Sequence, residues 1–449
     1  MTKVLQRVPG QCPPEVKSAH GVWLEDTDGN VYLDAVSGGA AVSAIGHGDS
    51  RVNDAIAAQL DQVAYAHNSF FTNRPAEELA ELLLSEAPEG LSQVLYCSGG
   101  SEAIESALKL ARQYWVEKGR PQKSRIISRR QSYHGATLGT LSVGGNMPRR
   151  DYYAPMLFDA QLIEPCYAYR LAHPDESEEA YGKRAAQHLE AAILEAGAEN
   201  VAAFVAEPVV GATLGCAPAV KGYFKEIRAI CDRHDVLLIL DEVMCGTGRT
   251  GYMYACLEDE VTPDLLAVAK GMGGGFVPIG AVLVHERLAE AIRSGSGALR
   301  HGFTYMAHPL SCAAALAVQK VIKDDGLVKA AQQKGELLRQ VLDERFGQHP
   351  NVGDIRGRGL FLGLELVRER NSKQPFDPSF AFHSRVKAAA LEAGLMIYPS
   401  GGTIDGKQGD HILLAPAYVV SETEIEEIAE RLSQALDATL VEAQAYGAI

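Results

Sequence analysis

The residues best suited to chemistry in this chain of 449 residues stand at the ends of two short apolar runs. Val236–Leu240 is followed at once by Asp241 and Glu242, and Leu265–Ala269 is followed by Lys270. Runs of this length and composition are typical of buried parallel strands. Ligands of open α/β sheets bind at the carboxyl ends of such strands. We therefore expect an acid and an amine to share one crevice.

A lysine at the end of a buried strand has two interpretations. Desolvation lowers the pKa of a lysine and makes its amine a nucleophile suited to Schiff-base chemistry. In that case Asp241 could hold a cationic ring nitrogen, such as that of a pyridoxal ring. The alternative is an ordinary ion pair between Lys270 and Asp241. These residues alone leave both interpretations open.

The same stretch also contains a possible dinucleotide motif. Residues 246–251 read GTGRTG, which fits G-x-G-x-x-G and follows a predicted strand. The dinucleotide fingerprint further requires a helix that opens within the motif. No helical cap follows here, so we expect the match to be accidental. A dinucleotide-dependent oxidoreductase is retained as an alternative.

Composition indicates a globular protein of two or three domains, with 47% apolar and 22% charged residues. The formal net charge of −15 argues against nucleic-acid binding and against an anionic membrane surface. No apolar run approaches the ~18–20 residues of a membrane span. The eight cysteines include no C-x-x-C pair, which argues against a metal site, and the N-terminus has no apolar signal core. We expect a cytoplasmic protein.

Other predicted strands also end on residues that could form a site. Val94–Cys97 precedes a Ser/Gly loop at 98–102 and a predicted helix, Ala103–Trp115. Free backbone N–H groups at such a helix entry bind phosphate, although Ser and Gly also simply cap helices. Ser124–Ser128 leads to Tyr133 and His134, where an aromatic ring could stack on a flat cofactor or pack in the core. Val201–Ala206 ends on Glu207.

The sequence pattern changes near Asp325. We expect one alternating strand at Ile355–Leu366, a helix at Phe380–Leu395 and a final helix that opens with a capping box at Ser421. We divide the chain into an N-terminal arm with part of a small domain (1–60), a large domain (61–325) and a C-terminal small domain (326–449). Phe70 and Phe71 are expected to pack in the core, with the rim of a pocket or a subunit contact as the alternative.

Taken together, these motifs resemble those of the class III, or ω-, aminotransferases, which are pyridoxal-phosphate enzymes of fold type I. The most specific pair is LDEVMCGTGRTG followed by AVAKGMGGG, and SGGSEAIESALKLAR, YHG, AEP and HGFTYMAHPL occur in the family's order. The similarity runs from about Gly21 to Tyr418. It implies an α/β fold in which a large domain holds a mostly parallel seven-stranded sheet beside a smaller α+β domain.

The resemblance also implies a role for each candidate residue. Pyridoxal 5'-phosphate would be held by Lys270 as the Schiff-base lysine and by Asp241 at the pyridine nitrogen. Phe303 and Thr304 would reach the cofactor of a neighbouring subunit, which implies a homodimer with active sites at its interface. The remaining cofactor contacts implied are Tyr133 against one ring face, Val243 against the other, Gly100 and Ser101 at the phosphate, and the adjoining His134 and Glu207.

The activity implied is ping-pong transamination through an aldimine on Lys270. It would carry an amino group from an amine or ω-amino acid to a 2-oxo acid, with pyruvate as the expected acceptor. The same lysine and aspartate would also serve a fold type I aminomutase, racemase or decarboxylase. A regulatory protein that binds pyridoxal phosphate without turnover is a further alternative.

One feature departs from the family pattern. Many members carry an arginine late in the small domain that binds a substrate carboxylate, but this chain has no arginine between Arg385 and Arg431. Lys407 or His411 could substitute, although a lysine offers a point charge rather than a two-pronged donor. Arg356 and Arg358 lie nearby in the sequence, and we expect both to form structural pairs.

Overall fold

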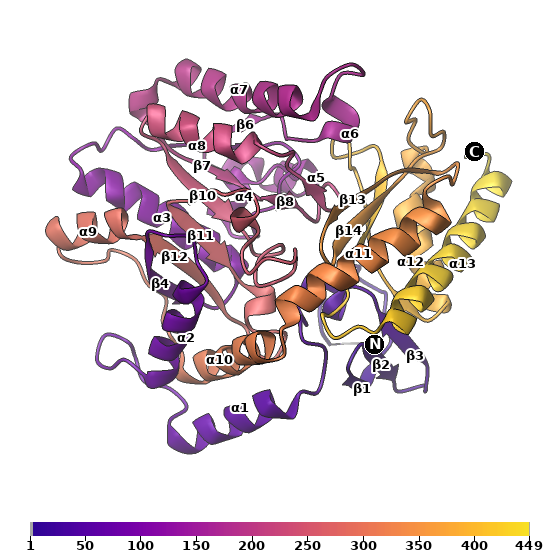
Figure 1. Ribbon diagram of the computed structural model, residues 1–449, viewed down its shortest axis with the longest axis horizontal. Coiled ribbons are helices and arrows are strands. Elements are labelled where there is room, and N and C mark those ends of the chain that lie inside the picture. The colour runs from indigo at the N-terminus through magenta and orange to yellow at the C-terminus, as the bar shows by residue number, and fades with distance from the viewer. Residues whose placement is uncertain (1–2, 449) are drawn as a thin grey trace.

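The computed structural model describes residues 3–448, which form two lobes, the larger built on a seven-stranded sheet (Figure 1). Residues 1, 2 and 449, the ends of the predicted arm and small domain, lie outside this range. β12 runs antiparallel to both of its neighbours and the other pairs are parallel, so the predicted mostly parallel sheet of seven strands is confirmed. The strand order is β4 (Leu91–Cys97), β12 (Gly280–His285), β11 (Leu265–Val268), β10 (Leu237–Asp241), β7 (Val201–Ala206), β5 (Arg125–Arg129), β6 (Gln161–Ile163).

Helices cover both faces of this sheet because its central strands are apolar on both sides. In β10, Leu237 and Ile239 face a core that includes α3 (Gly100–Glu117) and α9 (Glu286–Ser294). Leu238 and Leu240 face the opposite core. That second core is completed by α2 (Arg74–Ser85), α7 (Glu178–Ala196), α8 (Tyr223–Arg233) and α10 (Pro309–Asp324). Side chains that alternate between two cores are the expected signature of a doubly covered sheet.

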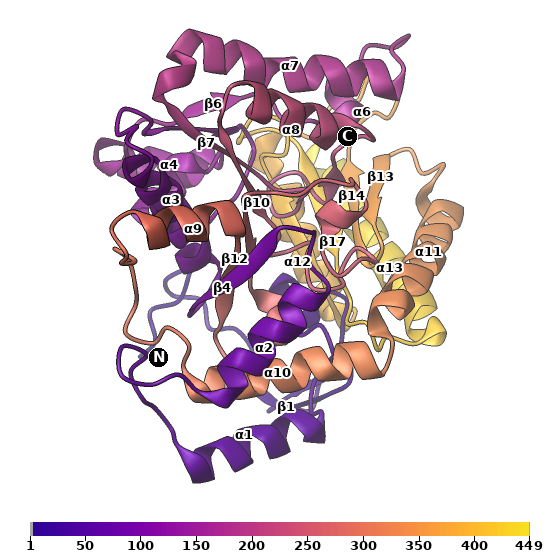
Figure 2. The ribbon, with the colours of Figure 1, turned by 60° about the vertical axis from the view of Figure 1, so that its left-hand side comes forward.

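The N-terminal helices extend the large lobe along α10. Both α1 (Ser50–Gln62) and α2 pack against α10, as Figure 2 shows. Asp49 and Asn73 cap these two helices, each accepting a hydrogen bond from a backbone N–H of the first turn.

The smaller lobe is an antiparallel sheet backed by three helices, α11 (Leu327–Phe346), α12 (Phe382–Glu392) and α13 (Glu422–Tyr446). The single strand predicted for Ile355–Leu366 is wrong, because the chain reverses at Gly359, whose φ is +53°. This φ is favourable for glycine. The capping box at Ser421 is confirmed. The sheet order is β13 (Val352–Arg358), β14 (Phe361–Leu366), β17 (Asp410–Leu414), β16 (Tyr398–Gly401).

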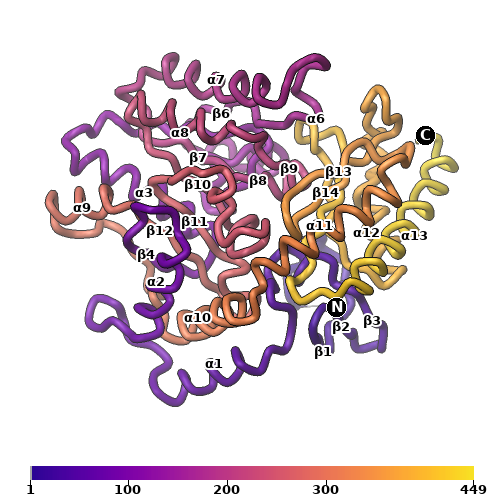
Figure 3. Tube along the Cα trace, in the orientation of Figure 1, coloured from indigo at the N-terminus to yellow at the C-terminus, as the bar shows by residue number. Residues whose placement is uncertain are grey.

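The first strands of the chain lie beside its last helix (Figure 3). β1 (Val16–His20), β2 (Trp23–Asp26) and β3 (Val31–Asp34) form an antiparallel sheet, and β3 pairs in parallel with β15 (Leu395–Met396). The indole of Trp23 donates to Glu424 Oε1 at 2.7 Å. The N-terminal segment is therefore part of the smaller lobe, while the domain boundaries at 60 and 325 stay a prediction.

Among the described residues, no helix combines the length and apolar character needed to cross a bilayer.

Candidate active site

A cavity of about 260 Å³ opens where β4, β5, β7, β10 and β11 end. The five strands run in the same direction, so the residues that follow them meet at one edge of the sheet. The cavity brings together most of the candidates named from the sequence: Gly100, Ser101, Tyr133, His134, Glu207, Asp241, Val243 and Lys270. The predicted crevice with an acid and an amine is thus present.

Lys270 follows β11 and opens onto the cavity. Its backbone is left-handed, with φ of +46°, a conformation that residues other than glycine adopt rarely and that often marks a functional site. Burial lowers the pKa of Lys270 to about 8, and the carboxylates of Asp241 and Glu207 partly oppose this shift. At pH 7 about one tenth of the amine is therefore uncharged and nucleophilic, far more than for a lysine with its ordinary pKa.

Asp241 is held at the end of β10 by two hydrogen bonds. Its Oδ1 accepts from the backbone N–H of Val243 at 3.0 Å, and its Oδ2 lies 2.8 Å from His134 Nδ1. The His134 side chain is fully buried, and no residue from 3 to 448 hydrogen-bonds to its other ring nitrogen, Nε2. His134 therefore orients the carboxylate, and Asp241 keeps acceptor capacity toward the cavity.

Glu207, at the end of β7, positions the backbone of a neighbouring strand end. Its Oε1 accepts from Tyr133 N at 3.0 Å, and its Oε2 accepts from Gly211 N at 3.2 Å. Burial raises the pKa of Glu207, while His134 opposes the rise. The carboxyl group thus fixes where the Tyr133 ring stands in the cavity wall.

The N-terminus of α3 forms another wall. Its N-cap residue, Gly99, supplies no side-chain acceptor, so the N–H groups of the first turn remain available to an anion. A Cβ on Gly100 would lie only 2.6 Å from Val243 Cγ1, so any residue larger than glycine would clash at this position. Ser101 Oγ accepts from Ala136 N at 3.1 Å and ties the helix entry to the segment after Tyr133.

Thr304 and Phe303 lie outside this cavity. Thr304 is exposed, and its carbonyl oxygen accepts a hydrogen bond from Tyr65 Oη at 2.7 Å. Phe70 and Phe71, expected in the core, are instead 78% and 68% exposed. The core interpretation of these two rings is wrong, because the NSFFTN segment carries them between helices and not onto a core-facing element.

Glu242, adjacent to Asp241 in the sequence, serves the local backbone instead of the cavity. Its carboxylate accepts from Ala255 N at 2.6 Å and Cys256 N at 2.8 Å, and burial raises its pKa to about 7. No helix opens within residues 246–251, so the G-x-G-x-x-G match lacks the structural context of a dinucleotide site.

Comparisons with known proteins identify the family of the chain. Residues 6–436 match the model of the family described as aminotransferase class III. The chain is 46% identical to an uncharacterised aminotransferase of Schizosaccharomyces pombe, over 96% of this chain and 94% of the relative. An uncharacterised aminotransferase of Bacillus subtilis is 41% identical, with 95% of each chain covered.

The fold also matches a solved amine transaminase from an uncultivated Pseudomonas species, whose structure has pyridoxal phosphate bound. The TM-score is 0.91 at 34% identity, with 98% of this chain and 99% of that chain covered. Fold and site thus define a fold type I transaminase of the pyridoxal-phosphate-dependent class. Within that class, this chain belongs to the class III aminotransferase family.

Proposed function

We propose that the protein is a homodimeric transaminase that binds pyridoxal 5'-phosphate and moves an amino group from an amine or ω-amino acid to a 2-oxo acid, by a ping-pong mechanism with pyruvate as acceptor. The observation that carries the proposal is the presence of Lys270 and Asp241 in one cavity beneath the N-terminus of α3. We expect the protein to act in the cytoplasm.

The donor set of the cavity fits the cofactor group by group. The amine of Lys270 suits an aldehyde, the carboxylate of Asp241 suits a protonated pyridine nitrogen, and the uncapped helix entry at Gly100 and Ser101 suits a phosphate. Tyr133 and Val243 also line the cavity and offer a ring and an apolar side chain for the faces of a flat ring. Pyridoxal phosphate, when bound, supplies an electron sink for the carbanion formed at the substrate carbon.

In this proposal Lys270 has two roles in succession. Its amine would hold the cofactor at the aldehyde carbon of pyridoxal phosphate. Its free amine, whose pKa burial lowers to about 8, would then be the base that takes the proton from the donor carbon and delivers it to the carbon of the cofactor's former aldehyde. His134 holds the Asp241 carboxylate in place while that carboxylate stabilises the ring cation.

The absorbance spectrum of the holoenzyme tests this function directly. A band from protein-bound pyridoxal phosphate should disappear when a donor amine is added alone, and return when pyruvate follows. Replacing Lys270 with Ala should abolish the exchange while the circular dichroism spectrum stays unchanged.

Each other result has a defined meaning. If the band returns only with 2-oxoglutarate, the acceptor is 2-oxoglutarate and not pyruvate. A band that no donor bleaches would favour the aminomutase, racemase or decarboxylase alternative. Absence of the band after pyridoxal phosphate is supplied would contradict the proposed cofactor, and full turnover by Lys270→Ala would contradict the proposed mechanism.

A further inference from the structure

A second cavity, of about 480 Å³, adjoins the cofactor cavity at Gly135. Its walls come from the short helices α4 (Leu138–Val143) and α5 (Met147–Arg150) and from the two tyrosines that follow them, Tyr152 and Tyr153. These walls are mostly apolar, and Arg149 provides the guanidinium within them. A pocket with apolar walls and one placed charge is typical of a small-molecule subsite.

Arg149 contacts the Tyr133 side chain and has no carboxylate partner among the described residues. Within residues 3–448, no carboxylate lies within ion-pair distance of its guanidinium. The guanidinium lies 5.0 Å from the centroid of the Tyr133 ring, and its Nη1 donates to Tyr133 Oη at 3.3 Å. Because Tyr133 lines the cofactor cavity, Arg149 stands at the junction of the two cavities.

The adjacent arginine shows the contrast. Arg150 Nη1 donates to the carbonyl oxygens of Leu141 at 2.8 Å and Gly144 at 2.9 Å, and also to that of Ser142. Arg150 therefore holds the C-terminal end of α4, while Arg149 spends one donor on Tyr133 Oη and keeps the others for a ligand.

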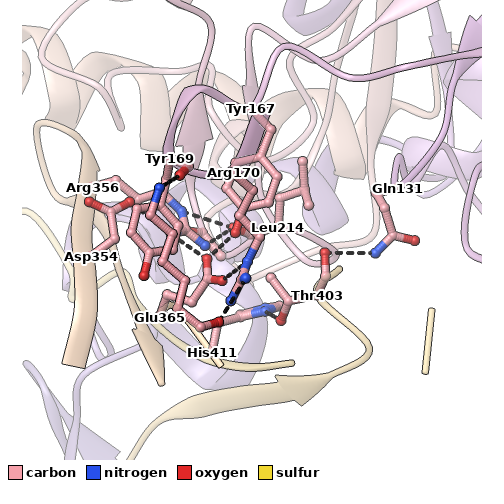
Figure 4. A network of polar contacts seen from close by, with 12 residues as sticks. Gln131, Tyr167, Tyr169, Arg170, Leu214, Asp354, Arg356, Glu365, Thr403 and His411 are labelled. Carbon is pink, nitrogen blue, oxygen red and sulfur yellow. Dashed lines mark hydrogen bonds and ion pairs between the residues drawn. The ribbon is translucent and has the colours of Figure 1, made fainter. Parts of the chain in front are cut away.

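The cations of the smaller lobe are engaged elsewhere. Figure 4 shows Arg356 in a buried network, in which its Nη1 lies 2.7 Å from Glu365 Oε2 and 2.9 Å from Asp354 Oδ2. Arg358 pairs with Asp259 at 3.1 Å. The structural pairing predicted for both arginines is thus confirmed, and neither is available to a substrate.

The two residues considered as substitutes for the family's late arginine are no better placed. Burial and the nearby Arg356 lower the pKa of His411 to about 3, so its ring is neutral, and it hydrogen-bonds to Thr403 Oγ1 at 2.7 Å. Lys407 is exposed in the loop 402–409 and lines neither cavity.

That loop nevertheless contacts the segment that carries Arg149. A Cβ on Gly406 would lie 3.2 Å from Pro148 Cδ, so the loop packs directly beside α5. Gln131 Nε2 donates to the carbonyl oxygens of Gly402 at 2.6 Å and Thr403 at 3.0 Å (Figure 4). The late segment therefore reaches this part of the site without placing a charged side chain in either cavity, and Arg149 supplies one beside it.

We propose that Arg149 binds the substrate carboxylate, both of an amino-acid donor and of the 2-oxo acid acceptor, with the body of the substrate along Leu138, Tyr152 and Tyr153. A guanidinium matches a carboxylate with two parallel hydrogen bonds, and stacking on Tyr133 fixes the plane of the fork. This inference rests on the proposed transaminase function and names its substrates as carboxylate-bearing.

The test compares substrates that differ only by a carboxylate, in holoenzyme with Arg149→Gln and Arg149→Lys. The donor pair is 4-aminobutyrate and propylamine, and the acceptor pair is pyruvate and acetaldehyde. Loss of a charged hydrogen bond of about 1.5–3 kcal/mol should lower kcat/KM by about 10- to 100-fold in Arg149→Gln for the carboxylates. The uncharged partners should change by less than about twofold, and Arg149→Lys should recover part of the loss.

A second measurement does not depend on turnover. Calorimetric titration of holoenzyme with butyrate should show binding that weakens at least about tenfold in Arg149→Gln. Lys407→Gln, which removes an exposed charge from the adjoining loop, should leave both measurements unchanged.

The proposal is overturned if Arg149→Gln lowers kcat/KM equally for the charged and the uncharged substrates, since the arginine would then act only through Tyr133. It is also overturned if neither kcat/KM nor butyrate binding changes. If none of the donors tested transfers an amino group in the wild-type protein, the proposed transaminase function fails instead. Butyrate binding still decides the role of Arg149.

Discussion

At the scale of single residues, the site depends on opposing electrostatic effects at Lys270. Burial favours the neutral amine, whereas the nearby carboxylates of Asp241 and Glu207 favour the cation. The balance gives a pKa of about 8, within reach of physiological pH. This position of the pKa leads to a prediction about cofactor uptake.

The rate at which cofactor-free protein captures pyridoxal phosphate should depend on pH. The neutral amine is the nucleophile, so below the pKa of Lys270 the rate should rise about tenfold per pH unit, and it should level off above about pH 8. Stopped-flow absorbance at a series of pH values measures this profile. A rate that is flat between about pH 6.5 and 9 would contradict the lowered pKa.

Replacing Glu207 with Gln provides the internal comparison for that profile. Because the Glu207 carboxylate raises the pKa of Lys270, its removal should shift the profile toward lower pH. An unchanged profile would indicate that Glu207 acts only through its hydrogen bonds to Tyr133 and Gly211.

At the scale of elements, the sequence predicted the sheet and the strand ends well because apolar runs and charged ends are local signals. It placed the start of α3 at Ala103, whereas the helix begins at Gly100. The missed turn is the one whose N–H groups line the cavity, and glycine and serine have low helix propensity. The reversal at Gly359 was missed because Gly357 and Gly363 lie close to it, so that one glycine of the run gave no distinct turn signal.

The contact between α3 and the loop after β10 can be tested by a paired substitution. Gly100→Ala would place a Cβ against Val243, and we expect it to cost about 1–3 kcal/mol of stability and to weaken cofactor retention. Val243→Ala in the same chain should restore part of both, since it removes the clashing atoms. The cofactor retained after dialysis and the midpoint of denaturation are measured for the single and the double variants. Equal losses in the single and double variants would argue against this contact.

A second prediction at this scale concerns Lys123, which has no exposed surface. Its amine donates to the carbonyl oxygens of Asp235 at 2.6 Å, Ala198 at 2.9 Å and Val201 at 3.0 Å. Lys123→Met would leave these acceptors unpaired and should lower the free energy of unfolding by about 2–4 kcal/mol. Urea denaturation measures the change, and Lys118→Met, at an exposed position, is the control. Equal effects would show that the buried bonds contribute nothing.

At the scale of the whole molecule, the cavity joins residues from Gly100 to Lys270, far apart in the sequence, and the order of their motifs could be predicted because each follows a strand. The role proposed for Arg149 could not be predicted from the sequence, since the surroundings of this arginine depend on how the loop 402–409 packs on α5. The exposure of Phe70 and Phe71 could not be predicted either, because a pair of aromatic residues has the same local sequence pattern in a core and at an interface.

These exposed rings and the position of Thr304 outside its own cavity support the proposed homodimer, in which Thr304 serves the cofactor of the neighbouring subunit. Large exposed apolar side chains gathered near one another are typical of an interaction surface. If Thr304 acts across the interface, each site combines Lys270 of one subunit with Thr304 of the other.

Mixed dimers distinguish this arrangement from one within a single chain. Thr304→Ala alone should weaken cofactor retention, and Lys270→Ala alone should abolish turnover. When the two variants are co-expressed with different tags, a dimer of one Thr304→Ala subunit and one Lys270→Ala subunit should have one intact site. That site combines Lys270 of the Thr304→Ala subunit with Thr304 of the Lys270→Ala subunit. That dimer should show about half of wild-type activity at limiting pyridoxal phosphate. Within a single chain no site would be intact, and the mixed dimer would fall to the level of Thr304→Ala or below.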